Sequence, residues 1–438
     1  MPHRASHHGR SASWHRALAL ASVLSCLLLA AAPAPALTID SDFEGASIRV
    51  TSIDASAQAI KFMPGGDPKR GWPCWWSFRA EGLDAGKPLT LELRASDLPM
   101  PQANGAPSTK PLAAEWSMPG RAVYSTDGKT WQQTPPGSLK EGTMSYQVPS
   151  GFTSLLVAWG PSYTPARATK MVQDIAMSSS AAEDLELCKS REGRRVPMLR
   201  VSEGDRVEAR RFGVWVQARQ HAWESGASWV CEGFAAWLMG SDTDAAWLRQ
   251  NAEIFVVPIM DVDNTATGNG GKEALPQDHN RDWSPKPNWH EVTAAQTHIR
   301  ELVKEERMDL FLDLHNPGPG DRKAFFYALP AELIKEPMLT HRKRFMALAR
   351  ASIGEVFPVM DGPKYDGPKY HPLWRQMSGT WVTQNGNPNT VALCLETPWN
   401  IEQSTVEGYK AVGAKLGQAV QKHLAERRAN EERVGKGK

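Results

Sequence analysis

This 438-residue sequence lacks paired cysteine motifs and lacks an excess of charge of either sign. It has five cysteines, none of them in a C-x-x-C arrangement, which excludes the usual thiolate zinc knuckle. Lysine plus arginine number 50 and aspartate plus glutamate 48, so the charge indicates neither nucleic acid nor an anionic membrane as a partner. The sequence does have an apolar fraction of 41% and 17 tryptophans, which is typical of a globular protein.

The first 36 residues differ in composition from the rest. They begin with three arginines and no acid, continue with an apolar segment at 17–32, and end in Ala-Pro-Ala at Ala36. This pattern predicts a signal peptide cleaved near Ala36, and hence export to the periplasm or the exterior; an uncleaved anchor is the alternative. Removing the three arginines leaves 47 basic residues against 48 acidic ones, a formal charge of −1.

The chain beyond residue 36 has no predicted membrane span. The apolar segment at 17–32 is itself too short, and too closely followed by proline, to cross a bilayer comfortably. An oxidising compartment would allow one or two disulfides, although spacing does not determine their pairing. The cysteines available for them are Cys74, Cys188, Cys231 and Cys394.

Two regions that differ in composition and hydrophobic pattern follow the predicted signal peptide. Residues 37–178 are rich in glycine, proline, serine and threonine and contain short alternating runs, among them a hairpin signal at Asp127-Gly128. No long helical period occurs in them, so this region is predicted to be an antiparallel β-sandwich domain. Residues 179–428 are predicted to form the catalytic domain, followed by a charged tail at 429–438.

The second region alternates between strand-like and helical segments. The apolar strand-like runs lie at 212–218, 253–260, 308–314 and 390–395, and the helical segments near 226–239, 289–306, 336–355 and 404–427. Continuous apolar strands that alternate with helices predict an α/β domain with a mostly parallel sheet covered by helices on both faces.

Polar residues gather at the carboxyl ends of these predicted strands, where open α/β sheets bind ligands. His221 and Glu224 follow the first strand, "PQDHNRDW" lies at 276–283, His315 ends the third strand and Glu396 the fourth. A single histidine such as His315 is more often a hydrogen-bonded core residue than a metal ligand. Glu396, considered alone, could simply end a strand. Their joint order at the strand ends of one domain favours a metal site.

Two histidines and a glutamate supply three ligands to one Zn²⁺ and leave a fourth position for water, which is the arrangement of a catalytic zinc site. Water bound to such an ion has a pKa of about 7. A further carboxylate, for which Glu396 is suited, then takes the proton of the water.

The motifs "HAWESGASWVCEGF", "DHNRDW", "DLH" and "LET" resemble, in order, those of the carboxypeptidase A-like zinc peptidases, and most of all the cytosolic carboxypeptidase-type branch. "WWSFRAEGLDAGKPLTLEL" in the first region resembles the β-sandwich that precedes the peptidase domain there. The resemblance implies that His221, Glu224 and His315 hold zinc and that Glu396 is the general base and acid.

The resemblance also implies how substrate and ligands are held. Asn280 and Arg281 would bind the terminal carboxylate of the substrate. Asp278 would accept the second ring N–H of His221. Asp313 is an alternative for that role, because it lies on the same face of its strand as His315.

This sequence departs from the family pattern in several places, one of which is "DVDNT" where the family has Asn-Pro-Asp. An arginine that usually follows Gly-Asn is replaced by Lys272, which can stabilise an oxyanion as a point charge with less geometric control. Ala-Trp stands at 222–223 in place of Pro-Gly. The family's mobile tyrosine has no clear match, and Tyr370 and Tyr327 are the candidates.

These observations predict an exported zinc metallocarboxypeptidase that acts on the C-terminus of a peptide or protein. One alternative is a zinc amidohydrolase, a deacylase or a cell-wall peptide amidase on the same fold. Another is a catalytically degenerate protein that binds a partner through the β-sandwich, a reading motivated by the missing arginine. The preferred C-terminal residue and the oligomeric state do not follow from the sequence.

Overall fold

The structure is a computed structural model that describes residues 36–101, 109–203 and 211–436. The predicted signal peptide lies, apart from Ala36, outside the described residues. Signal peptide and export therefore stay predictions.

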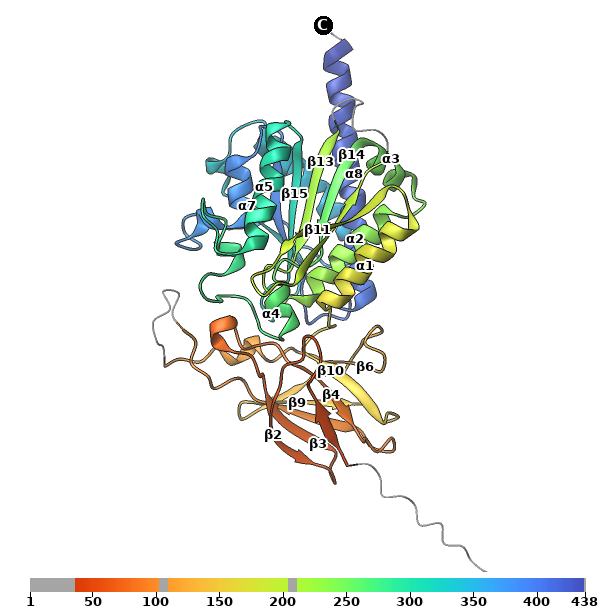
Figure 1. Cartoon of the computed structure of the whole chain (residues 1–438), viewed down its shortest axis with the longest axis vertical. Helices are drawn as coiled ribbons and strands as arrows, with labels where there is room; N and C mark the ends of the chain where they lie inside the picture. Colours follow the sequence, from red (N-terminus) through yellow and green to blue (C-terminus); the bar gives the residue numbers. More distant parts are fainter. Residues whose placement is uncertain (1–35, 102–108, 204–210, 437–438) are drawn as a thin grey trace, which may run out of the picture. The chain divides into compact units, whose positions relative to one another are not determined.

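The N-terminal region contains two five-stranded sheets (Figure 1). The first has the order β1 (Thr38–Asp40), β4 (Ser77–Glu81), β10 (Ser154–Ala158), β6 (Val123–Ser125), β7 (Gln132–Gln133). The second has the order β2 (Arg49–Asp54), β3 (Ala59–Met63), β5 (Leu89–Leu93), β9 (Thr143–Val148), β8 (Ser138–Lys140). The antiparallel strand-rich region is confirmed with one difference: β3 and β5 pair in parallel.

Alternation of side chains explains how these strands are packed. In β5 the leucines Leu89, Leu91 and Leu93 are buried, while Thr90 and Glu92 between them are partly exposed. The predicted turn at Asp127 connects β6 to β7, which pair antiparallel. The carboxylate of Asp127 accepts hydrogen bonds from the backbone N–H groups of the two residues at 129 and 130, at 2.8 and 2.7 Å, and so closes the turn.

The second region is built on an eight-stranded mixed sheet. Its order is β11 (Ala182–Lys189), β12 (Arg195–Val201), β14 (Ala252–Val257), β13 (Phe212–Ala218), β15 (Met308–His315), β18 (Val391–Glu396), β16 (Phe325–Ala328), β17 (Lys364–Tyr365). The four central strands β14, β13, β15 and β18 run parallel and are buried along their whole length. They are the four strands that the apolar runs predicted.

Helices cover both faces of this sheet. Helices α5 (His290–Lys304) and α7 (Ser378–Asn385) pack together, as do α2 (Ser225–Leu238), α6 (Met338–Ile353) and α8 (Val406–Lys436). Figure 1 shows α5 and α7 on one side of the sheet and α2 and α8 on the other. The shorter helices are α3 (Thr243–Asn251), α4 (Val262–Ala266), η1 (Pro68–Arg70), η2 (Ala114–Trp116), η3 (His279–Arg281), η4 (Ala331–Leu333) and η5 (Trp374–Gln376).

Several helices differ from the prediction, which lacks α1 (Pro165–Ser178), α3, α4 and α7. Helix α1 was missed, although Thr164 caps it by accepting a hydrogen bond from the backbone of Arg167. It packs against β11 and β12 of the second region, whereas the prediction assigned 165–178 to the sandwich. Helix α8 continues to Lys436 and so includes most of the segment predicted as a charged tail. The domain boundary at 178/179 stays a prediction.

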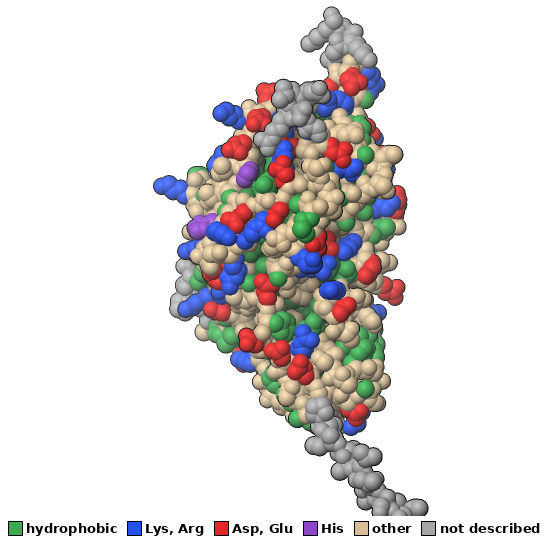
Figure 2. Space-filling model, turned by 45° about the vertical axis from the view of Figure 1, so that its right-hand side comes forward, with side chains coloured by type: hydrophobic (Ala, Val, Ile, Leu, Met, Phe, Trp, Pro, Cys, Tyr) green, Lys and Arg blue, Asp and Glu red, His purple; other side chains and the backbone are tan. Residues whose placement is uncertain are grey.

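The surface charges, the cysteines and the hydropathy of the helices can be compared with what the sequence indicated. On the face that Figure 2 shows, basic and acidic side chains are interspersed and do not gather by sign. The four cysteines within the described residues are free thiols, three of them buried, and form no disulfide. No helix among residues 36–101, 109–203 and 211–436 is long and apolar enough to cross a bilayer.

Candidate active site

A locked turn at the end of β13 presents the first two site residues. Arg219 has a positive φ of 67°, and its buried guanidinium donates to the carbonyls of Ala222 at 2.7 Å and Tyr163 at 2.8 Å. These bonds offset the strain of a left-handed backbone in a residue with a side chain. The chain then enters α2, with Glu224 at its N-cap position, so that His221 and Glu224 lie at the carboxyl edge of the sheet.

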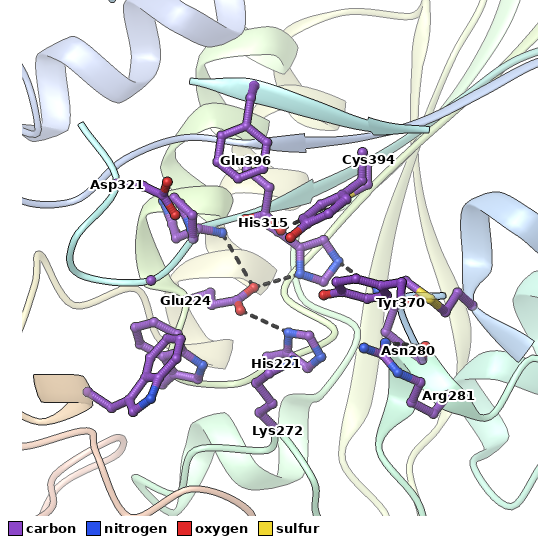
Figure 3. A pocket seen from close by; sticks show the side chains of 18 residues that line it. His221, Glu224, Lys272, Asn280, Arg281, His315, Asp321, Tyr370, Cys394 and Glu396 are labelled. Atoms are coloured by element: carbon purple, nitrogen blue, oxygen red, sulfur yellow. Dashed lines mark hydrogen bonds and ion pairs between the residues drawn. The ribbon is translucent and has the colours of Figure 1, made fainter. Parts of the chain in front are cut away.

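The two histidines converge on the carboxylate of Glu224 (Figure 3). His221 Nδ1 lies 2.8 Å from Glu224 Oε1, and His315 Nδ1 lies 2.7 Å from Glu224 Oε2. One ligand atom from each of the three residues lies within 4.8 Å of the other two, and all three side chains are buried. The three predicted metal ligands are therefore brought together, although they lie up to 94 positions apart in the chain.

Each histidine contacts a separate aspartate through Nε2, the ring nitrogen that does not face Glu224. Asp278 Oδ1 lies 3.2 Å from Nε2 of His221, and Asp313 Oδ2 lies 2.9 Å from Nε2 of His315. The sequence offered these two aspartates as alternatives for one role on His221. In the structure they take that role on different histidines. Such partners fix the ring orientation and leave both Nδ1 atoms directed at the same point.

The carboxylate of Asp313 is itself held by polar groups that the sequence analysis missed. Ser378 Oγ donates to Asp313 Oδ2 at 2.6 Å, and the side-chain amide of Gln220 donates to the same oxygen. Gln220 in turn accepts from Trp283 Nε1 at 2.7 Å. Gln220 directly precedes the candidate ligand His221, and this position in the sequence could have indicated that Gln220 belongs to the site. Ser378 gave none, because it reaches the site from the first turn of α7.

The charges of the ligand cluster suit a divalent cation. Burial opposes the charge of Glu224, but His221 and His315 outweigh it and lower the pKa of Glu224 to about 2. Burial likewise opposes the charge of His315, but Asp313 and Glu224 raise its pKa well above the usual value. A cation replaces these protons when it binds, because the imidazoles must be neutral to act as ligands. Two Nδ1 atoms and one carboxylate fit an open zinc site.

Glu396 ends β18 directly beside the ligand cluster. Its register partner on β15 is His315, and only 9% of its surface is exposed. Burial raises the pKa of Glu396 to about 7. Its Oε2 atom is buried and has no hydrogen-bond partner within the described residues, so this oxygen is free to accept a proton.

The remaining predicted residues line a cavity of about 190 Å³ around this cluster. Asn280 and Arg281 enter it from η3, where the guanidinium of Arg281 donates to the Asn280 carbonyl at 2.8 Å. Tyr370 and Tyr327 both line the cavity, with ring centres 5.2 Å apart. Tyr370 is 42% exposed and lies over Arg281, at 5.9 Å from ring centre to guanidinium.

Lys272 also lines the cavity, together with two aromatic residues that the sequence analysis did not place there. Trp116 comes from η2 in the N-terminal region, and Trp223 stands between the ligands His221 and Glu224. Their rings meet edge to face with centres 6.0 Å apart. No local pattern indicated Trp116, because the contact depends on how the two regions pack.

Comparison with known proteins identifies the family. The zinc carboxypeptidase family matches residues 169–318, which include all three candidate ligands. This part of the chain belongs to the zinc carboxypeptidase family. The members of that family depend on zinc, and the match indicates a hydrolase.

Individual proteins and solved structures are also similar to this chain. An uncharacterised protein of Zymomonas mobilis is 25% identical over 64% of this chain and 67% of its own length. Cytosolic carboxypeptidase 3 of Bos taurus is 31% identical over 24% of this chain, a match that spans only 11% of that protein. A metallo-carboxypeptidase structure from Burkholderia cenocepacia covers 89% of this chain and 99% of its own, with 22% identity and a TM-score of 0.71.

The structural likeness extends beyond the zinc carboxypeptidase match itself. A metallo-carboxypeptidase structure from Pseudomonas aeruginosa covers 89% of this chain with a TM-score of 0.69 at 21% identity. The fold of such structures therefore includes the N-terminal strand-rich region. Glu396 lies outside the matched residues 169–318, and its assignment depends on its place beside His315.

Proposed function

We propose that this chain is an exported zinc metallocarboxypeptidase, which hydrolyses the last peptide bond of a peptide or protein with a free C-terminus. One observation carries the proposal. Nδ1 of His221 and Nδ1 of His315 converge on the Glu224 carboxylate, while a buried carboxylate oxygen of Glu396 is left free beside them.

Each side chain has a distinct role in the proposed reaction. Zinc, when bound, supplies Lewis acidity and lowers the pKa of water to about 7. His221, Glu224 and His315 hold the ion. Glu396 accepts a proton from the attacking water and delivers it to the leaving amine, for which a pKa raised to about 7 is suitable near neutral pH.

The substrate is oriented by its terminal carboxylate. The guanidinium of Arg281, in the wall of the cavity, offers the planar fork that binds a carboxylate through two parallel hydrogen bonds, and the amide of Asn280 lies beside it. Lys272 lies in the same cavity and places a positive charge near the carbonyl oxygen on which negative charge develops.

Export is proposed on the sequence of the first 36 residues alone. A basic start, an apolar segment at 17–32 and Ala-Pro-Ala before residue 37 favour cleavage near Ala36. Edman sequencing of the protein recovered from a host that secretes it would give Leu37 or a near neighbour as the first residue.

A paired-peptide assay tests the reaction. Purified protein loaded with zinc is incubated with peptides that differ only in a free or an amidated C-terminus, and released amino acids are measured by mass spectrometry. We expect one bound zinc per chain and release from the free peptide only. Cleavage of both peptides favours the amidohydrolase alternative, and absence of stoichiometric zinc favours the binding-protein alternative.

A further inference from the structure

A segment of the N-terminal sandwich, Asp67–Trp72, is bonded to the loop that carries Lys272. The backbone N–H of Trp72 donates to the carbonyl of Lys272 at 2.9 Å, and the N–H of Gly271 donates to the carbonyl of Arg70 at 3.0 Å. These two hydrogen bonds join the backbones of the two regions at Gly271 and at Lys272.

Side chains extend this pairing along the loop. The Asn269 side-chain oxygen accepts from the backbone N–H of Asp67 at 2.8 Å, and the Asn264 side-chain oxygen accepts from Nε of Arg70 at 2.8 Å. These bonds place the loop against the sandwich at two further points. Lys272 is thus held at its main chain by residues from another part of the sequence, some 200 positions away.

This contact requires a glycine on each side, Gly270 in the loop and Gly71 in the sandwich segment. A Cβ atom on Gly270 would lie 2.0 Å from the carbonyl oxygen of Trp72, and one on Gly71 would lie 2.4 Å from the backbone of Gly271. Both distances are far shorter than real contacts of a Cβ atom. Position 270 is therefore glycine because the backbone of the sandwich touches it directly.

The indole of Trp72 also contacts the charged end of Lys272. The ammonium lies 5.2 Å from the centre of the ring, within the range of a cation–π interaction. The Trp72 ring is 9% exposed and is fixed in turn by Trp116, whose ring centre lies 4.4 Å away. Within the described residues, no carboxylate lies within ion-pair distance of the Lys272 ammonium. A lysine has a flexible four-carbon stem, and the contact with Trp72 restricts where the ammonium of this one lies.

We propose that Trp72 is a positioning residue for Lys272, so that the N-terminal sandwich completes the active site. The inference rests on the proposed function, in which Lys272 faces the scissile carbonyl. Trp72 does not line the cavity, so we expect it to act on the reaction through Lys272. Where the family usually has the rigid fork of arginine, this chain has a lysine whose position is set by an aromatic face.

A double-mutant cycle tests whether Trp72 acts through Lys272. Trp72→Leu is expected to lower kcat about 3- to 30-fold with zinc content unchanged, the range of a partly desolvated cation–π contact. In a Lys272→Met background the same change should alter kcat less than about 2-fold, because the group that it positions is gone. An equal loss in both backgrounds would overturn the proposal.

Two further variants separate positioning from a general loss of structure. Trp131→Leu removes another buried tryptophan of the sandwich, which does not line the cavity, and should leave kcat unchanged. Trp72→Phe keeps a weaker aromatic face, so it should lose less than Trp72→Leu. If Trp72→Leu loses zinc, Trp72→Phe is measured in both Lys272 backgrounds, and equal losses there reject the proposal.

A readout that needs no substrate separates this inference from the proposed function. The acetylation rate of each lysine is measured by mass spectrometry after brief exposure to acetic anhydride. In Trp72→Leu the rate at Lys272 should rise about 3-fold or more, because the indole no longer covers the amine. The rate at Lys129, in the sandwich, should not change. An unchanged rate at Lys272 contradicts the positioning role even if the protein hydrolyses no peptide.

Discussion

His315 and Glu396 are register partners on the neighbouring parallel strands β15 and β18. Register partners in a sheet project to the same face, and neighbouring strands lie about 4.8 Å apart. The candidate third ligand and the candidate base therefore cannot separate without breaking the central ladder of the sheet. The distance between His315 and Glu396 is therefore set by two buried central strands of the sheet.

Replacing Glu396 with glutamine should abolish catalysis without removing the metal. We expect kcat of Glu396→Gln to fall about 10²- to 10⁴-fold, because an amide cannot accept the proton of the water. Zinc content, measured by inductively coupled plasma mass spectrometry, should stay near one per chain. Glu402→Gln, the same change at an exposed site six residues later, is the matched control. Full activity in Glu396→Gln would remove the proposed mechanism.

Replacing Arg281 with lysine should weaken substrate binding. Loss of the two-pronged carboxylate contact is expected to lower kcat/KM about 10- to 100-fold, since hydrogen bonds between charged groups contribute about 1.5–3 kcal/mol. Steady-state kinetics on one peptide would show this chiefly in KM. The exposed Arg344→Lys change should have no effect. A KM equal to that of the wild type would mean that the carboxylate binds elsewhere.

Removing the negative charge behind His315 should weaken metal binding. Asp313→Asn can no longer accept from Nε2 of His315 as a carboxylate does, and we expect the zinc affinity to fall about 10- to 100-fold. Competition with a chromophoric chelator measures this directly. Asp361→Asn, at a fully exposed aspartate, serves as the control. An unaltered affinity would show that Asp313 serves only to pack the helix α7.

A pH-dependent stability is expected from Glu232. Burial opposes its ionisation, but Arg167 and Lys410 outweigh burial and lower the pKa of Glu232 below 4.5. Because the folded-state pKa is the lower one, ionised Glu232 stabilises the fold above pH 4.5, and this contribution disappears as the pH falls through the folded-state pKa.

Urea unfolding of Glu232→Gln with a chelator present tests this expectation. At neutral pH the variant should lose about 1–2 kcal/mol of unfolding free energy, and at about pH 4 the difference should shrink. Glu355→Gln removes an exposed ion pair with Lys415 and should change little at either pH. A loss that grows toward acid pH would contradict the assigned sign.

Much of the catalytic fold could be predicted because its central strands are buried on both faces. A strand such as β15 must then be apolar along its length, which makes it visible as a continuous run. The outer strand β11 was missed, because it is exposed on one side and its charged residues interrupt the run. Helix α1 was missed because its surroundings resemble the loops of the sandwich.

The sequence alone determined which residue types stand at the carboxyl ends of the parallel strands, and this was enough to predict His221, Glu224, His315 and Glu396 as one group. Local order suffices for them because each lies at the end of a strand that the apolar pattern identifies, or in the turn that follows it. Only the tertiary structure decided that Asp313 supports His315 while Asp278 supports His221, and that Trp72 lies over Lys272. Such contacts join segments whose distance in space depends on how separate elements pack, and a linear pattern does not contain that information.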